Sequence, residues 1–124
     1  MPPSSIPSLV LLVEDHAVIA MNTEILLLDL GVAEVKVAAS LAGALALIET
    51  TSFDFAILDV NLGEGENCLP IAERLTRDGV RFAFATGMGD EMVLPEAYGD
   101  AMILKKPYGF EDLAHLLSDE PNSE

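Results

Sequence analysis

The segment Leu9-Val-Leu-Leu-Val-Glu-Asp15 joins a run of five aliphatic residues directly to two acidic residues. A short, continuous apolar run of this kind is typical of a strand that is buried on both faces of a parallel sheet. In an open parallel α/β sheet the carboxyl ends of the strands share one edge, and ligands bind there. This segment therefore predicts both the kind of sheet and the edge at which its polar chemistry lies.

Three further apolar runs end in the same way. Residues 55–58 lead into Asp59, residues 82–85 into Thr86 and Gly87, and residues 101–104 into Lys105 and Lys106. Since the carboxyl ends of parallel strands meet at one edge, these side chains are expected to share a pocket with the two acids of the first segment. The pocket would hold three carboxylates, one hydroxyl and one ammonium group.

Strands and helices alternate along the chain. The expected strands are about 9–13, 34–38, 55–59, 82–86 and 101–105, and the expected helices about 17–30, 41–50, 68–78 and 110–118. Between the last two strands, Pro95 interrupts residues 87–100, so at most a short or irregular fourth helix is expected there. The pattern predicts a doubly wound parallel α/β sheet in one domain over 9–118, with a flexible N-terminus at 1–8 and a frayed C-terminus at 119–124.

The first helix carries more apolar residues than one face requires. Val18, Met21, Ile25 and Leu28 lie on one face at helical spacing, and residues 25–28 are all apolar. A broad contact with the core is the simpler interpretation, and a dimer surface is the alternative.

Composition narrows the functional classes. The chain has 124 residues, of which 51% are hydrophobic, and a net charge of −15. Such an acidic surface repels nucleic acid and anionic membranes, and no apolar run is long enough to cross a bilayer. The N-terminus lacks the features of a signal peptide, so a cytoplasmic protein is expected. The single cysteine, Cys68, excludes an internal disulfide and is expected to be a buried filler.

The three carboxylates of the expected pocket need a cation. Two carboxylates about 4 Å apart repel each other by roughly 4 kcal/mol at an effective dielectric constant of about 20. Oxygen ligands of this kind favour Mg²⁺, which with one lysine would balance the three negative charges. Asp15 and Asp59 would hold the metal, Glu14 would act through a metal-bound water, and the backbone carbonyl of Asn61 would complete the shell. His16 is near enough in sequence to approach the metal, although a solvated histidine is the simpler interpretation.

The same pocket is suited to phosphoryl transfer, because a divalent ion and an ammonium group stabilise a phosphoryl group in transfer. Asp59 is the candidate nucleophile and would form an aspartyl-phosphate. Thr86 would donate its hydroxyl to one phosphoryl oxygen, and Lys106 would pair with another. Gly87 leaves room for the backbone to approach the phosphate, and the bond before Pro107 is a candidate for the cis form.

Glu14-Asp15, Asp59, Thr86-Gly87 and Lys106-Pro107, in this order, resemble the receiver domain of bacterial two-component response regulators. The resemblance covers about residues 9–117. It implies a flavodoxin-like (βα)5 fold with strand order 2-1-3-4-5 and Mg²⁺-dependent phosphotransfer to Asp59 from a histidine kinase or a histidine phosphotransfer protein. It implies no enzyme activity beyond the chain's own phosphotransfer and dephosphorylation. The chain would be a stand-alone receiver that binds a downstream protein partner or serves as a phosphate relay or sink.

Two positions depart from the usual receiver pattern. Receivers carry Tyr or Phe three residues before the lysine, where this chain has Ile103; Tyr98 and Tyr108 are the candidates to replace that switch aromatic. Residues 82–87, Phe-Ala-Phe-Ala-Thr-Gly, also resemble the FATGUY subgroup of receivers, although Arg81 and Met88 differ from the residues usual there.

Two other classes remain as alternatives. A Mg²⁺-dependent phosphohydrolase of the haloacid dehalogenase kind needs a second aspartate two residues after the nucleophile, and Asn61 occupies that position. A pseudo-receiver would be an interaction module without phosphorylation. The presence of every pocket residue argues against the pseudo-receiver.

Overall fold

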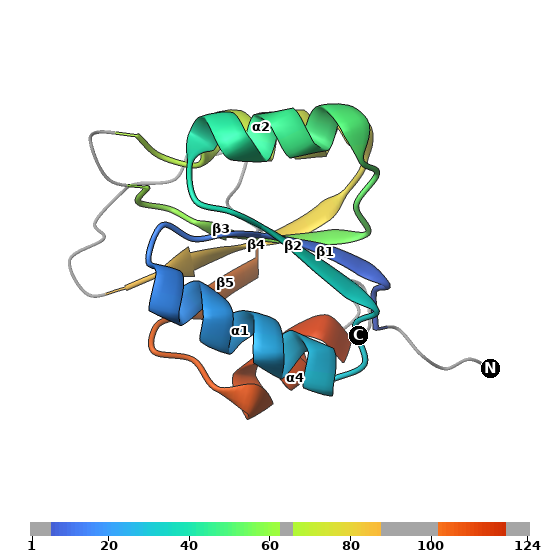
Figure 1. Ribbon diagram of the computed structural model, residues 1–124, viewed down its shortest axis with the longest axis vertical. Helices are drawn as coiled ribbons and strands as arrows, with labels where there is room; N and C mark the ends of the chain where they lie inside the picture. Colours follow the sequence, from blue (N-terminus) through green and yellow to red (C-terminus); the bar gives the residue numbers. More distant parts are fainter. Residues whose placement is uncertain (1–5, 63–65, 88–101, 119–124) are drawn as a thin grey trace.

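The computed structural model describes residues 6–62, 66–87 and 102–118 (Figure 1). These ranges contain five strands and four helices, which are β1 Leu9–Val13, α1 Ala17–Asp29, β2 Glu34–Ala38, α2 Leu41–Thr50, β3 Phe55–Asp59, α3 Leu69–Asp78, β4 Arg81–Thr86, β5 Met102–Lys105 and α4 Phe110–Ser118. The expected elements are confirmed, with bounds that differ by one residue at four of them. The expected irregular helix after residue 87, most of the N-terminal segment and the C-terminal segment fall outside the described residues.

The described strands form one parallel sheet in the order β2-β1-β3-β4-β5, as predicted. The chain moves outward from β1 to β2 and then crosses to β3 on the other side of β1, so the strand order reverses between β1 and β3. Ligand sites of open α/β sheets lie at the carboxyl ends of the strands beside such a reversal. The fold therefore places its site where β1 and β3 end.

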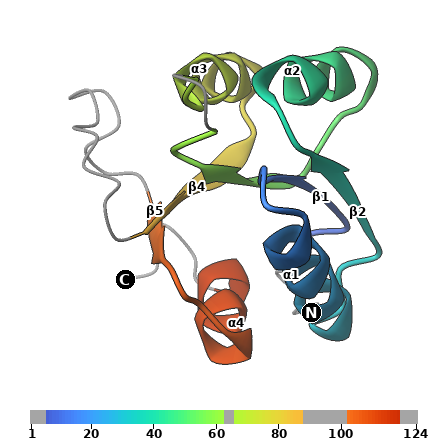
Figure 2. The same cartoon turned by 60° about the vertical axis from the view of Figure 1, so that its left-hand side comes forward.

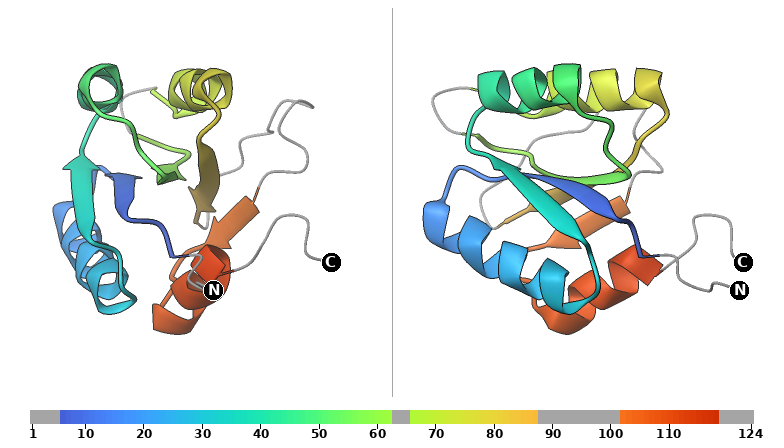
Figure 3. Two further views of the ribbon diagram at one scale, coloured as in Figure 1. Left: turned by 90° about the vertical axis from the view of Figure 1, so that its right-hand side faces the viewer. Right: turned by 45° about the vertical axis from the view of Figure 1, so that its right-hand side comes forward.

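Helices cover both faces of the sheet, with α2 and α3 on one side and α1 and α4 on the other (Figures 2 and 3). Alternate strand residues point to opposite faces and serve the two cores. Leu11 and Val13 of β1 belong to the core under α2 and α3, whereas Val10 and Leu12 belong to the core under α1 and α4. This explains why β1 and β3 are continuously apolar rather than alternating.

Two helix ends carry recognisable local caps. The Ser40 hydroxyl accepts a hydrogen bond from Gly43 N at 3.0 Å and caps α2. Gly79 ends α3 with φ 77°, a conformation that favours glycine.

Cys68 is fully buried before α3, and burial raises the pKa of its thiol to about 12. A thiol with this pKa is inert at neutral pH, which confirms the prediction of a buried filler.

Helix α1 corrects one prediction. Its inward face consists of Ala20, Thr23 and Leu27. The four residues assigned to one face by their spacing do share a face, but it is the nearly opposite one, and they are exposed: Val18 (65%), Met21 (55%), Ile25 (53%) and Leu28 (44%). Within the 25–28 run, Leu26 and Leu27 pack against the core whereas Ile25 and Leu28 are exposed, so the expected core contact is confirmed for only half of the run. Because apolar residues surround this helix, its periodicity does not select the side that packs against the sheet.

None of the helices in the described ranges has both the length and the apolar character needed to cross a membrane.

Candidate functional site

The backbone at the site edge is held in place by the sheet itself. Three amides just beyond or at the strand ends continue the parallel ladder, from Glu14 N to Ala38 O (3.0 Å), from Val60 N to Ala85 O (3.1 Å) and from Lys106 N to Thr86 O (2.7 Å). These bonds join β1 to β2, β3 to β4 and β5 to β4. The sheet thus anchors the residues that carry the polar side chains before any side chain makes a contact.

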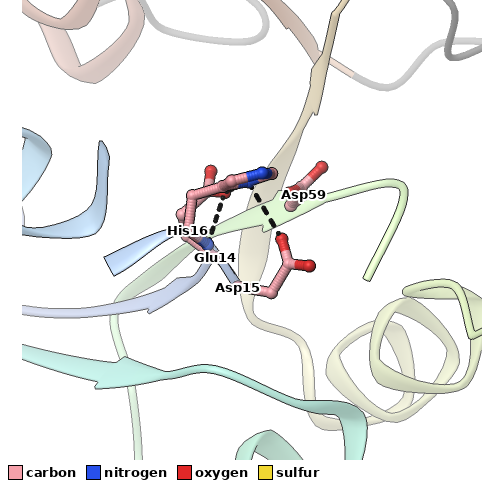
Figure 4. Close-up of side chains that lie close together, drawn as sticks. All are labelled: Glu14, Asp15, His16 and Asp59. Carbon is pink, nitrogen blue, oxygen red and sulfur yellow. Dashed lines mark hydrogen bonds and ion pairs between the residues drawn. The ribbon is translucent and has the colours of Figure 1, made fainter. Parts of the chain in front are cut away.

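The acidic side chains gather as the sequence predicts. Glu14 and Asp59 are buried, with 2% and 1% of their surface exposed, and the Asp15 side chain is partly exposed. One ligand atom each from Glu14, Asp15, His16 and Asp59 lies within 4.8 Å of the others. Figure 4 shows these side chains converging from the ends of two neighbouring strands.

Lys106 supplies positive charge to the two buried acids. Its Nζ lies 3.1 Å from Asp59 Oδ2 and 3.4 Å from Glu14 Oε1. Burial alone would lower the pKa of Lys106, but the negative charges of Asp59 and Glu14 outweigh burial and raise it. Lys106 therefore stays protonated throughout the neutral range.

Asp59 has a raised pKa in this cluster. Burial first, and then the charge of Glu14, raise the pKa of Asp59 from its ordinary 3.8 to about 6. The amide of Asn61, which donates to Asp59 Oδ1 at 3.2 Å, and the ammonium of Lys106 act in the opposite direction. At neutral pH Asp59 is thus mostly ionised but more basic than an exposed aspartate.

The acids also show where positive charge is missing. Among the described residues, no hydrogen bond reaches the buried atoms Asp15 Oδ1 and Asp59 Oδ2. Asp59 Oδ2 has Lys106 as an ion-pair partner, whereas Asp15 has only the His16 ring, 3.3 Å away, within the described ranges. A set of carboxylate oxygens with too few donors suits a divalent cation, and the residues present fit Mg²⁺.

The other predicted residues lie at the same edge. Thr86 ends β4, next to the residue that pairs with Asp59, but among the described residues its hydroxyl makes no hydrogen bond to a site carboxylate. Gly87 and Asn61 line a cavity of about 560 Å³ beside Asp59. The Lys106–Pro107 peptide bond is cis, as the sequence suggested.

His16 is solvated, as the simpler interpretation expected, and its ring also contacts the acid pair. Its side chain is 68% exposed, yet Nδ1 lies 3.2 Å from Glu14 Oε2 and 3.3 Å from Asp15 Oδ1. Its position directly after the acid pair was a signal for this contact, but the direction of the ring was not encoded in the spacing.

Tyr108 makes a contact that the sequence did not reveal. Its hydroxyl shares a hydrogen bond of 3.0 Å with the buried hydroxyl of Thr23 on α1, and its ring lines the cavity beside Asp59. Ile103, at the position of the usual switch aromatic, is exposed on β5. Tyr98, the other candidate to replace that aromatic, lies outside the described residues. No sequence motif links Thr23 with Tyr108, because the two residues are 85 positions apart.

The raised pKa of Asp59 predicts a pH-dependent stability difference. An acid whose pKa is higher in the folded state stabilises the fold fully below about pH 4, and this contribution is lost as the pH rises through about 6. Asn cannot ionise, so Asp59→Asn is expected to match wild type near pH 4 and to be more stable by about 1–3 kcal/mol near pH 8. Urea unfolding with EDTA across this pH range measures the difference.

The matched control is Asp29→Asn, which removes an exposed aspartate at the end of α1. Its effect should stay within about 0.5 kcal/mol at every pH. A stability difference for Asp59→Asn that does not change with pH would contradict the raised pKa.

The receiver class of α/β proteins is defined by a buried aspartate, an acid pair and a lysine. These residues lie at the carboxyl edge of a parallel sheet with strand order 2-1-3-4-5. Residues 10–118 match the family model of the response regulator receiver domain, and the chain belongs to this family.

Solved structures agree with this assignment. The chain is similar to SdrG from Sphingomonas melonis Fr1, with 39% identity, a TM-score of 0.80, and coverage of 93% of this chain and 96% of that one. The BeF3-activated conformation of SdrG from Pseudomonas melonis Fr1 is also similar, with 39% identity, a TM-score of 0.75, and coverage of 90% and 93%. A CheY-like receiver domain from Methylobacillus flagellatus shares the fold at 23% identity, with a TM-score of 0.77 and coverage of 89% and 95%. No curated protein matches the chain.

Proposed function

We propose that this chain accepts a phosphoryl group on Asp59 from a histidine kinase or a histidine phosphotransfer protein. The observation that carries the proposal is the Asp59 carboxylate itself, which is buried at the carboxyl end of β3 and has the Lys106 ammonium 3.1 Å from its Oδ2. A carboxylate oxygen attacks the phosphorus, the phosphorus–nitrogen bond of the donor breaks, and its electron pair stays on the donor imidazole. The chain acts on no other substrate and catalyses only its own phosphotransfer and dephosphorylation.

Each pocket residue has a role in this proposal. Asp15, Asp59 and the Asn61 carbonyl would hold Mg²⁺, and Glu14 would act through a metal-bound water. When bound, Mg²⁺ offsets the negative charge of the carboxylates and the phosphoryl oxygens. Lys106, whose Nζ already lies 3.1 Å from Asp59 Oδ2, pairs with a phosphoryl oxygen. Thr86, at the end of the neighbouring strand, donates its hydroxyl to another phosphoryl oxygen.

Phosphorylation would signal by changing the binding of a protein partner, or the chain would pass its phosphoryl group on as a relay or sink. We also propose that the protein acts in the cytoplasm, as the sequence suggested.

The proposed phosphorylation is supported by the solved BeF3-activated conformation of SdrG, which is 39% identical to this chain. We extend activation of this kind to the present chain, with Asp59 as the acceptor.

Intact-protein mass spectrometry tests the proposal after incubation with acetyl phosphate and Mg²⁺. Wild type and the control Asp29→Asn should gain one phosphoryl group, while Asp59→Asn or any sample with EDTA should gain none. If wild type gains no phosphoryl group from acetyl phosphate or from a phosphorylated kinase, the chain is a pseudo-receiver. Rapid donor hydrolysis without an adduct would favour the phosphohydrolase.

A further inference from the structure

We infer that His16 is a metal ligand, and that its imidazole lets this pocket take transition-metal divalent cations such as Co²⁺ in addition to Mg²⁺. The inference rests on the proposed metal site and adds a nitrogen donor to it. The change matters because the other expected ligands are all oxygen atoms.

The first support is the placement of the ring. Nδ1 lies between the carboxylates of Glu14 and Asp15, at 3.2 and 3.3 Å from their oxygens, and Figure 4 shows the ring extended over the acidic cluster. The backbone also holds the residue, because His16 N donates to Glu14 Oε2 at 3.2 Å and His16 O accepts from Ala20 N at 2.9 Å. His16 is therefore fixed at the start of α1 with its nitrogen directed at the acids.

The second support is the uneven distribution of charge. Lys106 contacts Glu14 and Asp59, so it serves one side of the cluster. Asp15 Oδ1 is buried and receives no hydrogen bond from the described residues, and the His16 ring is its nearest ion-pair partner there. Asp15 and Asp59 would hold the cation, and His16 Nδ1, which lies 3.3 Å from Asp15 Oδ1, would add a nitrogen donor to them.

The chemistry of the donor set then decides which cations fit. Carboxylates and carbonyls suit Mg²⁺ and Mn²⁺, whereas an imidazole nitrogen favours Co²⁺, Ni²⁺ and Zn²⁺. One nitrogen beside three carboxylates should therefore raise the affinity for Co²⁺ while leaving that for Mg²⁺ nearly unchanged. When the metal is absent, the same nitrogen can contact the two carboxylates in its place.

The chain offers an internal control, because its two histidines lie apart. His115 is exposed on α4, away from the acidic cluster. In NMR spectra with stoichiometric Co²⁺, the imidazole signals of His16 should shift or broaden while those of His115 stay in place, and EDTA should restore the spectrum. The inference would be overturned if the signals of both histidines responded equally to Co²⁺. It would also be overturned if the His16 signals did not respond.

Calorimetric titration supplies the affinity. Co²⁺ is expected to bind His16→Asn at least about tenfold more weakly than wild type or His115→Asn, while Mg²⁺ binds all three within about twofold. Equal Co²⁺ affinity for wild type and His16→Asn, with Mg²⁺ still bound, would overturn the ligand role alone. If wild type does not bind Mg²⁺ but binds Co²⁺ in a way that depends on His16, the result would support the ligand role. The same result would count against the proposed Mg²⁺ site.

Discussion

Replacing Lys106 with methionine is expected to lower the free energy of unfolding by about 2–3 kcal/mol near pH 8 in the absence of metal. The substitution keeps much of the side chain's length but removes the ammonium that lies between Glu14 and Asp59. Both carboxylates are almost wholly buried, so water cannot replace the lost charge. Two unscreened negative charges would then face each other at the carboxyl edge of the sheet.

The dependence of this loss on pH and metal identifies its cause. Since the pKa of Asp59 is raised to about 6, acidification through that range neutralises it and should shrink the loss toward pH 4. Lys106 itself has a raised pKa, so its own charge is constant over this range and is lost only at strongly alkaline pH. Saturating Mg²⁺ should also reduce the loss, because a bound cation supplies the missing charge.

Lys105→Met is the matched control. Lys105 is the adjacent residue, is exposed, and ends β5, so the same substitution there should cost less than about 0.5 kcal/mol. Urea unfolding of the three proteins measures the effect. If Lys106→Met lowers the free energy of unfolding equally at pH 4 and pH 8, packing of the side chain rather than its charge stabilises the pocket.

Helix α1 yields the second large effect. Leu27→Ala is expected to destabilise the fold by about 2–5 kcal/mol, because Leu27 is fully buried and its removal leaves a cavity. Ile25→Ala, two residues away on the same helix, should change stability by less than about 0.5 kcal/mol or raise it slightly. Ile25 is 53% exposed, and alanine favours the helix more than isoleucine does. Urea unfolding of both variants measures the contrast.

A comparable loss for the two variants would contradict the exposed position of Ile25. Such a result would favour the alternative in which the apolar face of α1 is covered by a second copy of the chain. Unfolding at two protein concentrations separates these cases, since the stability of a dimer depends on concentration and that of a monomer does not.

Much of the site could be predicted because it depends on strand ends. Continuous apolar runs identify the strands, and parallel strands bring their carboxyl ends to one edge whatever the details of packing. The prediction that Asp59 and Lys106 meet is confirmed by their ion pair. Thr86 lies at the predicted strand end. Its contact with a phosphoryl oxygen requires a phosphorylated Asp59, so that contact stays a prediction.

The sequence by itself determined the elements, the sheet type and the edge at which the acids gather, since these follow from local periodicity and from the residues directly after each apolar run. Only the tertiary structure decided which side of α1 is buried, because an apolar helix has more than one face that can pack against a sheet. The contact of His16 with Glu14 and Asp15 and the hydrogen bond between Thr23 and Tyr108 were also decided there. Such contacts depend on side-chain directions and long-range packing, which no local pattern specifies.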